Sequence, residues 1–311
     1  MILITGCTGY VGSQIAYALY KNKKKFIGID NLKCSYEKNL IFKKNFHKID
    51  ISDKKVLKII KNSNIKTVVH CAAYAYVNEG EHFKKRYLLN NVKNTKKFIN
   101  ICEKNHIDNF IFLSSSNVYK EKINNSLKDS EINPKNIYGK NKIEIENFLN
   151  KKKFKSKIIL RLFNIIGMQS KFYVYRPKIK YQRIFFKLLY KKFRPRLNYY
   201  MKNNLKKYPS RDFIDIKDFT NLMIKILNKL KKSKVNGTFN VGSGNSISIL
   251  DLYNKFKKLK KGISKPSFAL LKKEELIGTK AKINKTKKYF NWKPNKSLNH
   301  SIKSLVRLCK T

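Results

Sequence analysis

The chain has 311 residues, of which 42% are hydrophobic, so it is long and apolar enough to bury a sizeable globular core. It carries 71 Lys+Arg against 19 Asp+Glu, and a formal net charge of +52 raises the possibility of a nucleic-acid or anionic-membrane binder. Nearly all basic residues are Lys and they are spread along the whole chain, which favours compositional bias over a sequence-reading surface. We therefore expect no specific nucleic-acid partner.

Cysteine usage and hydropathy bear on location and metals. The five cysteines contain no C-x-x-C pair and the five histidines have no ligand spacing, so neither a disulfide framework nor a metal site is expected. No apolar run approaches the ~18 residues needed to span a bilayer. The first residues have the pattern of a core strand and not of a signal peptide. We expect a cytoplasmic protein without membrane contact.

The first half of the chain alternates short apolar runs with helical patterns. Near-continuous apolar runs predict strands at 2–5, 26–30, 67–73, 110–116 and 158–164. Helical patterns lie around 11–22, 53–62, 82–105 and 137–151. This order predicts a Rossmann-type α/β fold, a doubly wound parallel sheet with a ligand crevice at the carboxyl ends of its strands.

The pattern weakens after Gly167, and residues 168–210 receive no assignment. A strand and helix are expected from 212–218, a strand ending in a glycine turn at 237–244, and helices around a short apolar segment in 245–311. We predict a nucleotide-binding domain of residues 1–167 plus about 212–245. The segments 168–211 and 246–311 should form a smaller α+β domain for the substrate.

The first strand runs directly into a glycine-rich turn, Gly6 to Gly12, ahead of a helix. Such glycines permit a tight turn and a close approach to a pyrophosphate, and the helix N-terminus offers N–H groups to its phosphates. Asp30 ends the second strand, where an acid binds the adenosine ribose and repels a 2′-phosphate. Both signals together predict NAD in preference to NADP. They disfavour an ordinary strand–turn–helix with a solvated aspartate.

Tyr138 and Lys142 lie four residues apart on an expected helix and share one face. A lysine ammonium beside a phenol favours the phenolate, lowers the phenol pKa and makes a usable base. Ser115 ends the fourth strand at the crevice edge, where its hydroxyl could bond the substrate oxygen. A Y-x-x-x-K match is weak evidence in a chain so rich in Tyr and Lys. It gains weight from its place after the nucleotide loop and the serine.

A set of ordered motifs resembles the extended short-chain dehydrogenase/reductase superfamily, and within it the UDP-glucose 4-epimerases of the NAD-dependent epimerase/dehydratase family. The motifs are TGCTGYVGS at 5–13, IDN at 29–31, HCAA at 70–73, SSSNVY at 114–119, IYGKNK at 137–142, RLFN at 161–164, RDFIDIKD at 211–218 and FNVGSG at 239–244. The resemblance covers nearly the whole chain and is thinnest between 168 and 210. It implies a nucleotide-sugar substrate and a homodimer formed through the helices near 82–105 and 137–151.

The resemblance also implies roles for single residues. The catalytic group comprises Ser115, Tyr138 and Lys142. The cofactor-binding residues are Gly6, Gly9, Tyr10, Val11, Gly12, Asp30, Asn31, Asp50, Ile51, Ala72, Ala73, Asn90, Ser114, Tyr138, Lys142 and Phe163. The substrate-binding residues are Ser115, Tyr138, Asn164, Arg211, Lys272, Glu275 and Thr279. The small Thr279 is expected beside the sugar 2-substituent, where it would leave room for an acetamido group.

Several positions depart from the family pattern. Ala75 stands where these epimerases commonly have a cofactor-contacting lysine, and residues 207–210 replace a glycine-rich turn. Lys272 and Glu275 occupy positions of an Arg and an Asp that hold the uridine side. These changes leave open which nucleotide base and which sugar the substrate carries.

The residues after Ser115 bear on the reaction type. Ser116 and Asn117 provide no acid for elimination, which favours C4 epimerisation of UDP-glucose/UDP-galactose or the N-acetylated pair. The alternatives are a nucleotide-sugar dehydratase or reductase and a non-catalytic NAD-sensing regulator, and the presence of Tyr138 and Lys142 counts against the regulator.

Overall fold

The computed structural model describes residues 1–40, 44–120, 131–169, 184–189 and 194–308. Its largest element is a seven-stranded, fully parallel sheet of order β11-β6-β5-β4-β1-β2-β3. The strands are β1 (Ile2–Thr5), β2 (Phe26–Asp30), β3 (Phe46–Lys48), β4 (Thr67–His70), β5 (Asn109–Ser115), β6 (Ser156–Leu162) and β11 (Asn236–Val241). The predicted Rossmann-type fold is confirmed.

Successive side chains of the sheet enter two different cores, because a strand directs neighbouring residues to opposite faces. In β1, Leu3 packs on one face and Ile4 on the other, and Phe110 and Ile111 of β5 divide in the same way. Apolar residues at consecutive positions are therefore needed to bury both faces, which explains the continuous apolar runs.

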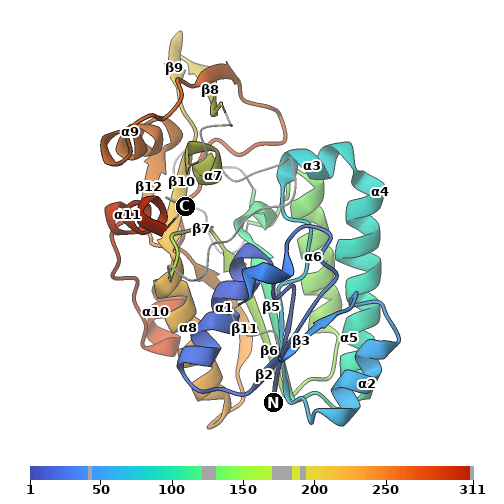
Figure 1. Cartoon of the computed structure of the whole chain (residues 1–311). Coiled ribbons are helices and arrows are strands. Elements are labelled where there is room, and N and C mark those ends of the chain that lie inside the picture. Colours follow the sequence, from blue (N-terminus) through green and yellow to red (C-terminus); the bar gives the residue numbers. More distant parts are fainter. Residues whose placement is uncertain (41–43, 121–130, 170–183, 190–193, 309–311) are drawn as a thin grey trace.

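Helices cover both faces of the sheet (Figure 1). On one face lie α1 (Tyr10–Lys21) and α8 (Ile216–Leu230), which contact each other. The other face carries α2 (Lys55–Asn62), α5 (Thr95–Lys104) and α6 (Ile137–Asn150). The helix expected over 82–105 is divided into α4 (Lys84–Tyr87), a π-helix η2 (Leu88–Asn94) and α5, and it follows a short helix α3 (Val77–His82).

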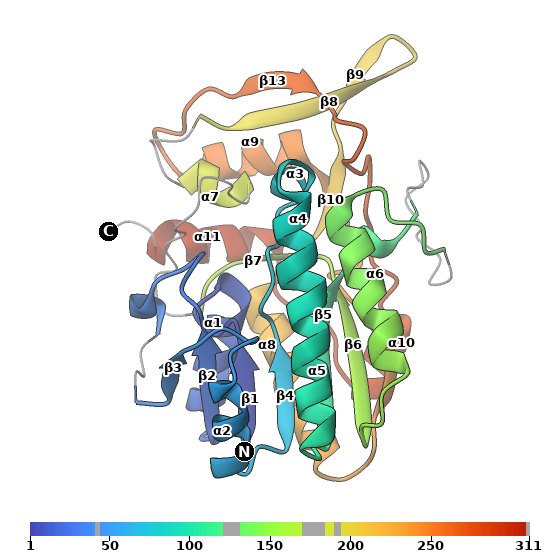
Figure 2. The same cartoon turned by 90° about the vertical axis from the view of Figure 1, so that its right-hand side faces the viewer.

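Most of the C-terminal part lies above the carboxyl ends of the large sheet (Figure 2), whereas α10 (Asn284–Phe290) packs beside β11 and α8. One small sheet has the order β12-β10-β7, and the other has the order β13-β8-β9. Their strands are β7 (Asn164–Ile166), β10 (Ser210–Asp215), β12 (Ser246–Ser248), β8 (Arg196–Lys202), β9 (Leu205–Lys207) and β13 (Ser267–Leu270). The helices are α7 (Ile184–Leu189), α9 (Ile249–Leu259), α10 (Asn284–Phe290) and α11 (Leu298–Leu308), and two 3-10 turns elsewhere are η1 (Glu37–Asn39) and η3 (Ser116–Val118).

The smaller α+β part is therefore present, and the exact domain limits stay a prediction. The chain crosses between the two parts more than once, because β10 pairs with β7 before α8 and β11 return to the large sheet. Of the segment 168–210 that had no sequence assignment, the described residues form α7, β8 and β9. No helix in the described ranges is long and apolar enough to cross a membrane.

Candidate active site

A cleft of about 570 Å³ opens between the carboxyl ends of the large sheet and the C-terminal part. Its walls come from the loop after β1, the ends of β4, β5 and β6, the start of α6, and residues of α7 and β10. A smaller cavity of about 90 Å³ continues it beside β2 and shares Gly6, Gly9 and Cys34 with it. The crevice predicted at this edge of the sheet is thus present.

The glycines of the first loop are required by its geometry. Gly6 has a φ of +66°, and a Cβ on it would lie 2.7 Å from the backbone N of Ala72. A Cβ on Gly12 would lie only 2.2 Å from the carbonyl oxygen of Gly6, so the start of α1 packs directly on the turn. No side chain caps this helix at Gly9, which lines the cleft, so the first-turn N–H groups suit a phosphate. The loop therefore fits a dinucleotide pyrophosphate.

The smaller cavity contains most of the residues expected at the adenosine end. It is lined by Asp30, Asn31, Ile51, Ala72, Ala73 and Asn90, among others. The backbone N–H groups of Thr8 and Leu32 donate to the Asp30 carboxylate at 3.2 and 2.9 Å, while burial raises its pKa. Asp50 does not line either cavity. It accepts a hydrogen bond of 2.7 Å from Asn31 and so holds that side chain at the rim.

Tyr138 and Lys142 project from α6 into the cleft and are 9% and 6% exposed. The Lys142 Nζ lies 5.6 Å from the centre of the Tyr138 ring and donates to the carbonyl oxygen of Leu113 at 2.7 Å. Burial lowers the pKa of Lys142 to about 8, although the Cys71 thiol and the Glu146 carboxylate act in the opposite direction. At neutral pH the Lys142 side chain is therefore mainly an ammonium, and it lies beside the Tyr138 ring.

Ser115 ends β5 and lines the same cleft. Its Oγ accepts hydrogen bonds from the backbone N and the side-chain Nδ2 of Asn117, both at 3.2 Å, so the hydroxyl proton remains available for a further acceptor. Asn136 caps α6 through Gly139 N at 2.8 Å and also donates to the Asn117 side chain at 3.2 Å. The serine and the start of the tyrosine helix are therefore tied together. The cleft brings together all three predicted catalytic residues.

The π-helix η2 contributes a residue that holds the part of the cleft wall at Tyr74. Asn91, which the sequence analysis did not single out, accepts from Tyr74 N and donates to Tyr74 O, both at 2.9 Å. Tyr74 lines both cavities, and its ring stacks on Tyr87 at 5.4 Å between centres. π-Helical turns often occur at functional sites because they redirect one side chain. The π-helical segment contains the Asn91 that holds this part of the cleft wall.

At the substrate end, Asn164, Arg211 and Glu275 line the cleft as expected. Two other expected residues are not among those that line the cleft, and their roles stay predictions. Lys272 does not line the cleft and pairs its Nζ with Glu274 at 4.0 Å. Thr279 is 2% exposed and lies outside the lining residues, with its Oγ1 3.5 Å from the backbone N of Asp212.

Thr279 is buried because its N–H donates to Ser210 O at 3.1 Å, which turns this segment inward against β10. The placement of Thr279 as a wall of the sugar pocket stays a prediction, and its burial in this structure does not support it. A cation that the analysis missed does line the cleft, namely Lys187 of α7. Burial and the nearby Arg196 lower its pKa, and Glu275 opposes this change.

A family model described as "NAD dependent epimerase/dehydratase family" matches residues 2–242. The chain belongs to this family. The predicted family and the predicted NAD cofactor are thereby confirmed at the level of the family. The single roles of the lining residues remain proposals.

Relatives and solved structures agree with this family. The bifunctional protein GAL10 of Pachysolen tannophilus is 31% identical over 82% of this chain, which covers only 41% of that protein. The "Uncharacterized UDP-glucose epimerase YtcB" of Bacillus subtilis is 26% identical, with 97% of this chain and 95% of that protein covered. The UDP-N-acetylglucosamine 4-epimerase of Methanobrevibacter ruminantium M1, solved with UDP-N-acetylmuramic acid, has a TM-score of 0.82, 26% identity and coverage of 99% and 97%.

Proposed function

We propose that the chain is an NAD-dependent nucleotide-sugar 4-epimerase that inverts C4 of a UDP-sugar through a 4-keto intermediate. The observation that carries this proposal is the convergence of Ser115, Tyr138 and Lys142 in one cleft whose serine is followed by Ser116 and Asn117. Among the described lining residues the acid is Glu275, which accepts from Asn198 at 2.6 Å and comes from the C-terminal part. No acid next to Ser115 could eliminate water from a keto sugar.

The residues of the cleft have separate roles in a reversible oxidation of the sugar. NAD, held in the cleft, would supply the hydride acceptor and donor for this oxidation and reduction. Tyr138 as the phenolate takes the proton of the 4-hydroxyl and gives it back when the carbonyl is reduced. Lys142 stabilises the phenolate, and the Ser115 hydroxyl donates to the sugar oxygen. The buried surroundings of these groups strengthen each electrostatic contact and keep bulk water away.

The far end of the cleft suits an anionic anchor about which the keto sugar can turn. Arg211 presents a guanidinium there, which can bind two phosphate oxygens at once. Lys187 also lines the cleft, whereas Lys272 is not a lining residue and pairs with Glu274. We infer that Arg211 and Lys187 hold the diphosphate of the nucleotide-sugar. Asn164, the first residue of β7, also lines the cleft.

A second candidate function deserves a test because of one relative. The dTDP-D-glucose 4,6-dehydratase of Dictyostelium discoideum is 29% identical over 82% of this chain. The reaction that this name describes includes the elimination of water from the sugar. A reductase is a third possibility on this scaffold. The missing acid beside Ser115 favours the epimerase over both.

Incubation with a panel of UDP-, dTDP- and GDP-sugars, followed by NMR of the products, tests the proposal. We expect inversion at C4 of a UDP-sugar and no dehydrated product. Tyr138→Phe should abolish turnover, while calorimetry should find NAD binding unchanged. Tyr20→Phe, on the exposed face of α1, is the matched control and should behave as the parent. A 4-keto-6-deoxy product would establish the dehydratase instead.

We also propose that the protein forms a homodimer through α4, η2 and α6. Phe83, Leu88 and Leu89 expose large apolar side chains on this side of the molecule. Light scattering should give twice the chain mass. Leu89→Glu should shift the equilibrium to the monomer, because it places a charge in an apolar contact.

A further inference from the structure

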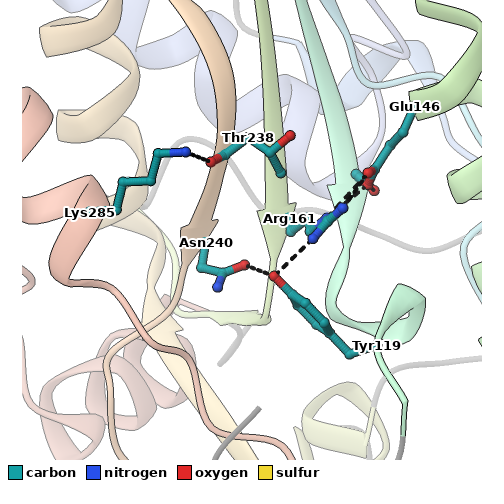
Figure 3. A network of polar contacts seen from close by, with 7 residues as sticks. Tyr119, Glu146, Arg161, Thr238, Asn240 and Lys285 are labelled. Carbon is teal, nitrogen blue, oxygen red and sulfur yellow. Dashed lines mark hydrogen bonds and ion pairs between the residues drawn. The ribbon is translucent and has the colours of Figure 1, made fainter. Parts of the chain in front are cut away.

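A buried carboxylate on the catalytic helix has no place in the reaction described so far. Glu146 lies one helical turn after Lys142 on α6 and is 3% exposed. Arg161 of β6 approaches it with two nitrogens, Nε at 3.1 Å from Oε1 and Nη2 at 2.7 Å from Oε2 (Figure 3). The Ser114 hydroxyl also donates to Glu146. This carboxylate is fully occupied by partners from β5 and β6.

The contacts of α6 with β5 follow consecutive residues of the strand. Lys142 Nζ donates to Leu113 O, and Glu146 accepts from Ser114, the next residue. Two contacts one helical turn apart fix the helix both along its axis and around it. Ser115, the third residue in the row, is thereby placed opposite the start of the same helix. A slip or rotation of α6 would break both contacts together.

The ion pair is itself supported from the neighbouring strand β11. Arg161 Nη1 donates to the Tyr119 hydroxyl at 3.1 Å, and this hydroxyl donates to Asn240 of β11 at 2.5 Å (Figure 3). A buried carboxylate or guanidinium without a partner is strongly destabilising, so each member keeps the others in place. The position of α6 is thus linked to three strands of the sheet.

We propose that Glu146 is a positioning residue whose contacts with Ser114 and Arg161 hold α6 in register on β5, so that Tyr138 and Lys142 lie beside Ser115. The reaction it serves is the one proposed above, and in this respect the inference rests on that proposal. The contact itself does not depend on which sugar is turned over.

The charges around Lys142 give this role a measurable signature. The groups facing Lys142 are Cys71 and His70 from the end of β4 and Tyr138 and Glu146 from α6. Burial raises the pKa of Cys71 well above its usual value and lowers that of His70 to about 3, so both are neutral at pH 7. Of the two groups that oppose the effect of burial on the pKa of Lys142, the Cys71 thiol is therefore uncharged, and the ion-paired Glu146 is the negative group that remains. Its removal should lower the pKa of Lys142.

The test uses ¹³C-lysine NMR titration of the full chain with NAD, in which Lys142 is assigned by its loss in Lys142→Arg. Glu146→Gln should lower the Lys142 midpoint and reduce kcat by about 10- to 100-fold with little change in KM, as expected when reacting groups are misplaced. Glu144→Gln is the matched control on the same helix, because Glu144 is exposed and pairs with Lys96 at 2.6 Å. It should leave both quantities unchanged.

Two further variants keep the test open if Glu146→Gln does not fold. Ser114→Ala removes one hydroxyl and should change kcat in the same direction by a smaller factor. The double variant Glu146→Gln with Arg161→Met leaves no unpaired buried charge and should also lower the midpoint. A Lys142 midpoint and a kcat in these variants equal to those of Glu144→Gln would overturn the inference. If the parent turns over no nucleotide-sugar, the proposed function fails, and the lysine titration alone decides the role of Glu146.

Discussion

Gly139 follows Tyr138 on α6 and packs against the backbone of the turn that positions Ser115. A Cβ on Gly139 would lie 2.2 Å from the carbonyl oxygen of Asn117 and 2.9 Å from its carbonyl carbon. An ordinary carbon contact needs about 3.5 Å, so Gly139→Ala must separate α6 from this turn by about 1.3 Å. Because Asn117 holds the Ser115 hydroxyl, the same shift moves the serine away from Tyr138.

A displacement of about 1 Å between reacting groups costs on the order of 100-fold in rate, or about 2.7 kcal/mol in the activation barrier. Gly139→Ala should therefore lower kcat by about 100-fold, and overpacking should lower stability by about 1–3 kcal/mol. The cofactor loop is on β1 and α1, so calorimetry should find NAD binding as in the parent. Turnover is measured with the UDP-sugar that the product analysis identifies.

Lys140→Ala, at the next and exposed position of α6, serves as the control and should leave kcat unchanged. The reasoning is refuted if Gly139→Ala folds with normal stability and turns over at the parental rate. In that case the turn at Asn117 yields to the added methyl group without moving Ser115.

Three further predictions concern the two ends of the cleft and its charge. Asp30→Ala should narrow the preference for NAD over NADP by about tenfold or more, or about 1.4 kcal/mol, and equal affinities in the parent would contradict the ribose assignment. Turnover should fall as the pH rises through the Lys142 pKa of about 8, because the ammonium that favours the phenolate is then lost. In Lys142→Arg this fall in turnover at alkaline pH should be absent, because a guanidinium keeps its charge. Thr279→Tyr should lower the melting temperature and reduce the activities on UDP-glucose and UDP-N-acetylglucosamine alike, because Thr279 is buried. A selective loss of the activity on UDP-N-acetylglucosamine would instead show that Thr279 lines the sugar pocket.

Local sequence patterns predicted the elements that are buried on both faces. The runs 2–5 and 26–30 agree with β1 and β2 to the residue, because each apolar side chain enters one of the two cores. The small sheet of β13, β8 and β9 was missed. Met201, Leu205, Phe268 and Leu270 are exposed there among lysines, so no alternation of apolar and polar residues marks these strands.

The candidate site was predicted well where a residue ends a strand or directly follows one. Gly6, Asp30 and Ser115 occupy such positions, and each lines the cavities. Residues brought in by tertiary packing left no local signal. Glu146 and Arg161 are fifteen positions apart on different elements, and Lys187 lies in a segment without periodicity. Thr279 was placed by alignment with a family pattern, whereas its burial depends on the backbone contact with Ser210.

The position of β11 at the edge of the large sheet has a consequence for synthesis on the ribosome. β6 pairs with β5 on one side and with β11 on the other, yet about 74 residues separate the end of β6 at Leu162 from the start of β11 at Asn236. Until β11 emerges, the nascent chain presents β6 as an unpaired and strongly apolar edge, which is a surface for wrong pairing between chains. The intervening segment carries α8, which covers one face of the sheet, and β10, which pairs with β7 in the C-terminal part. Truncation anywhere before Val241 should therefore yield aggregating protein, whatever its catalytic residues.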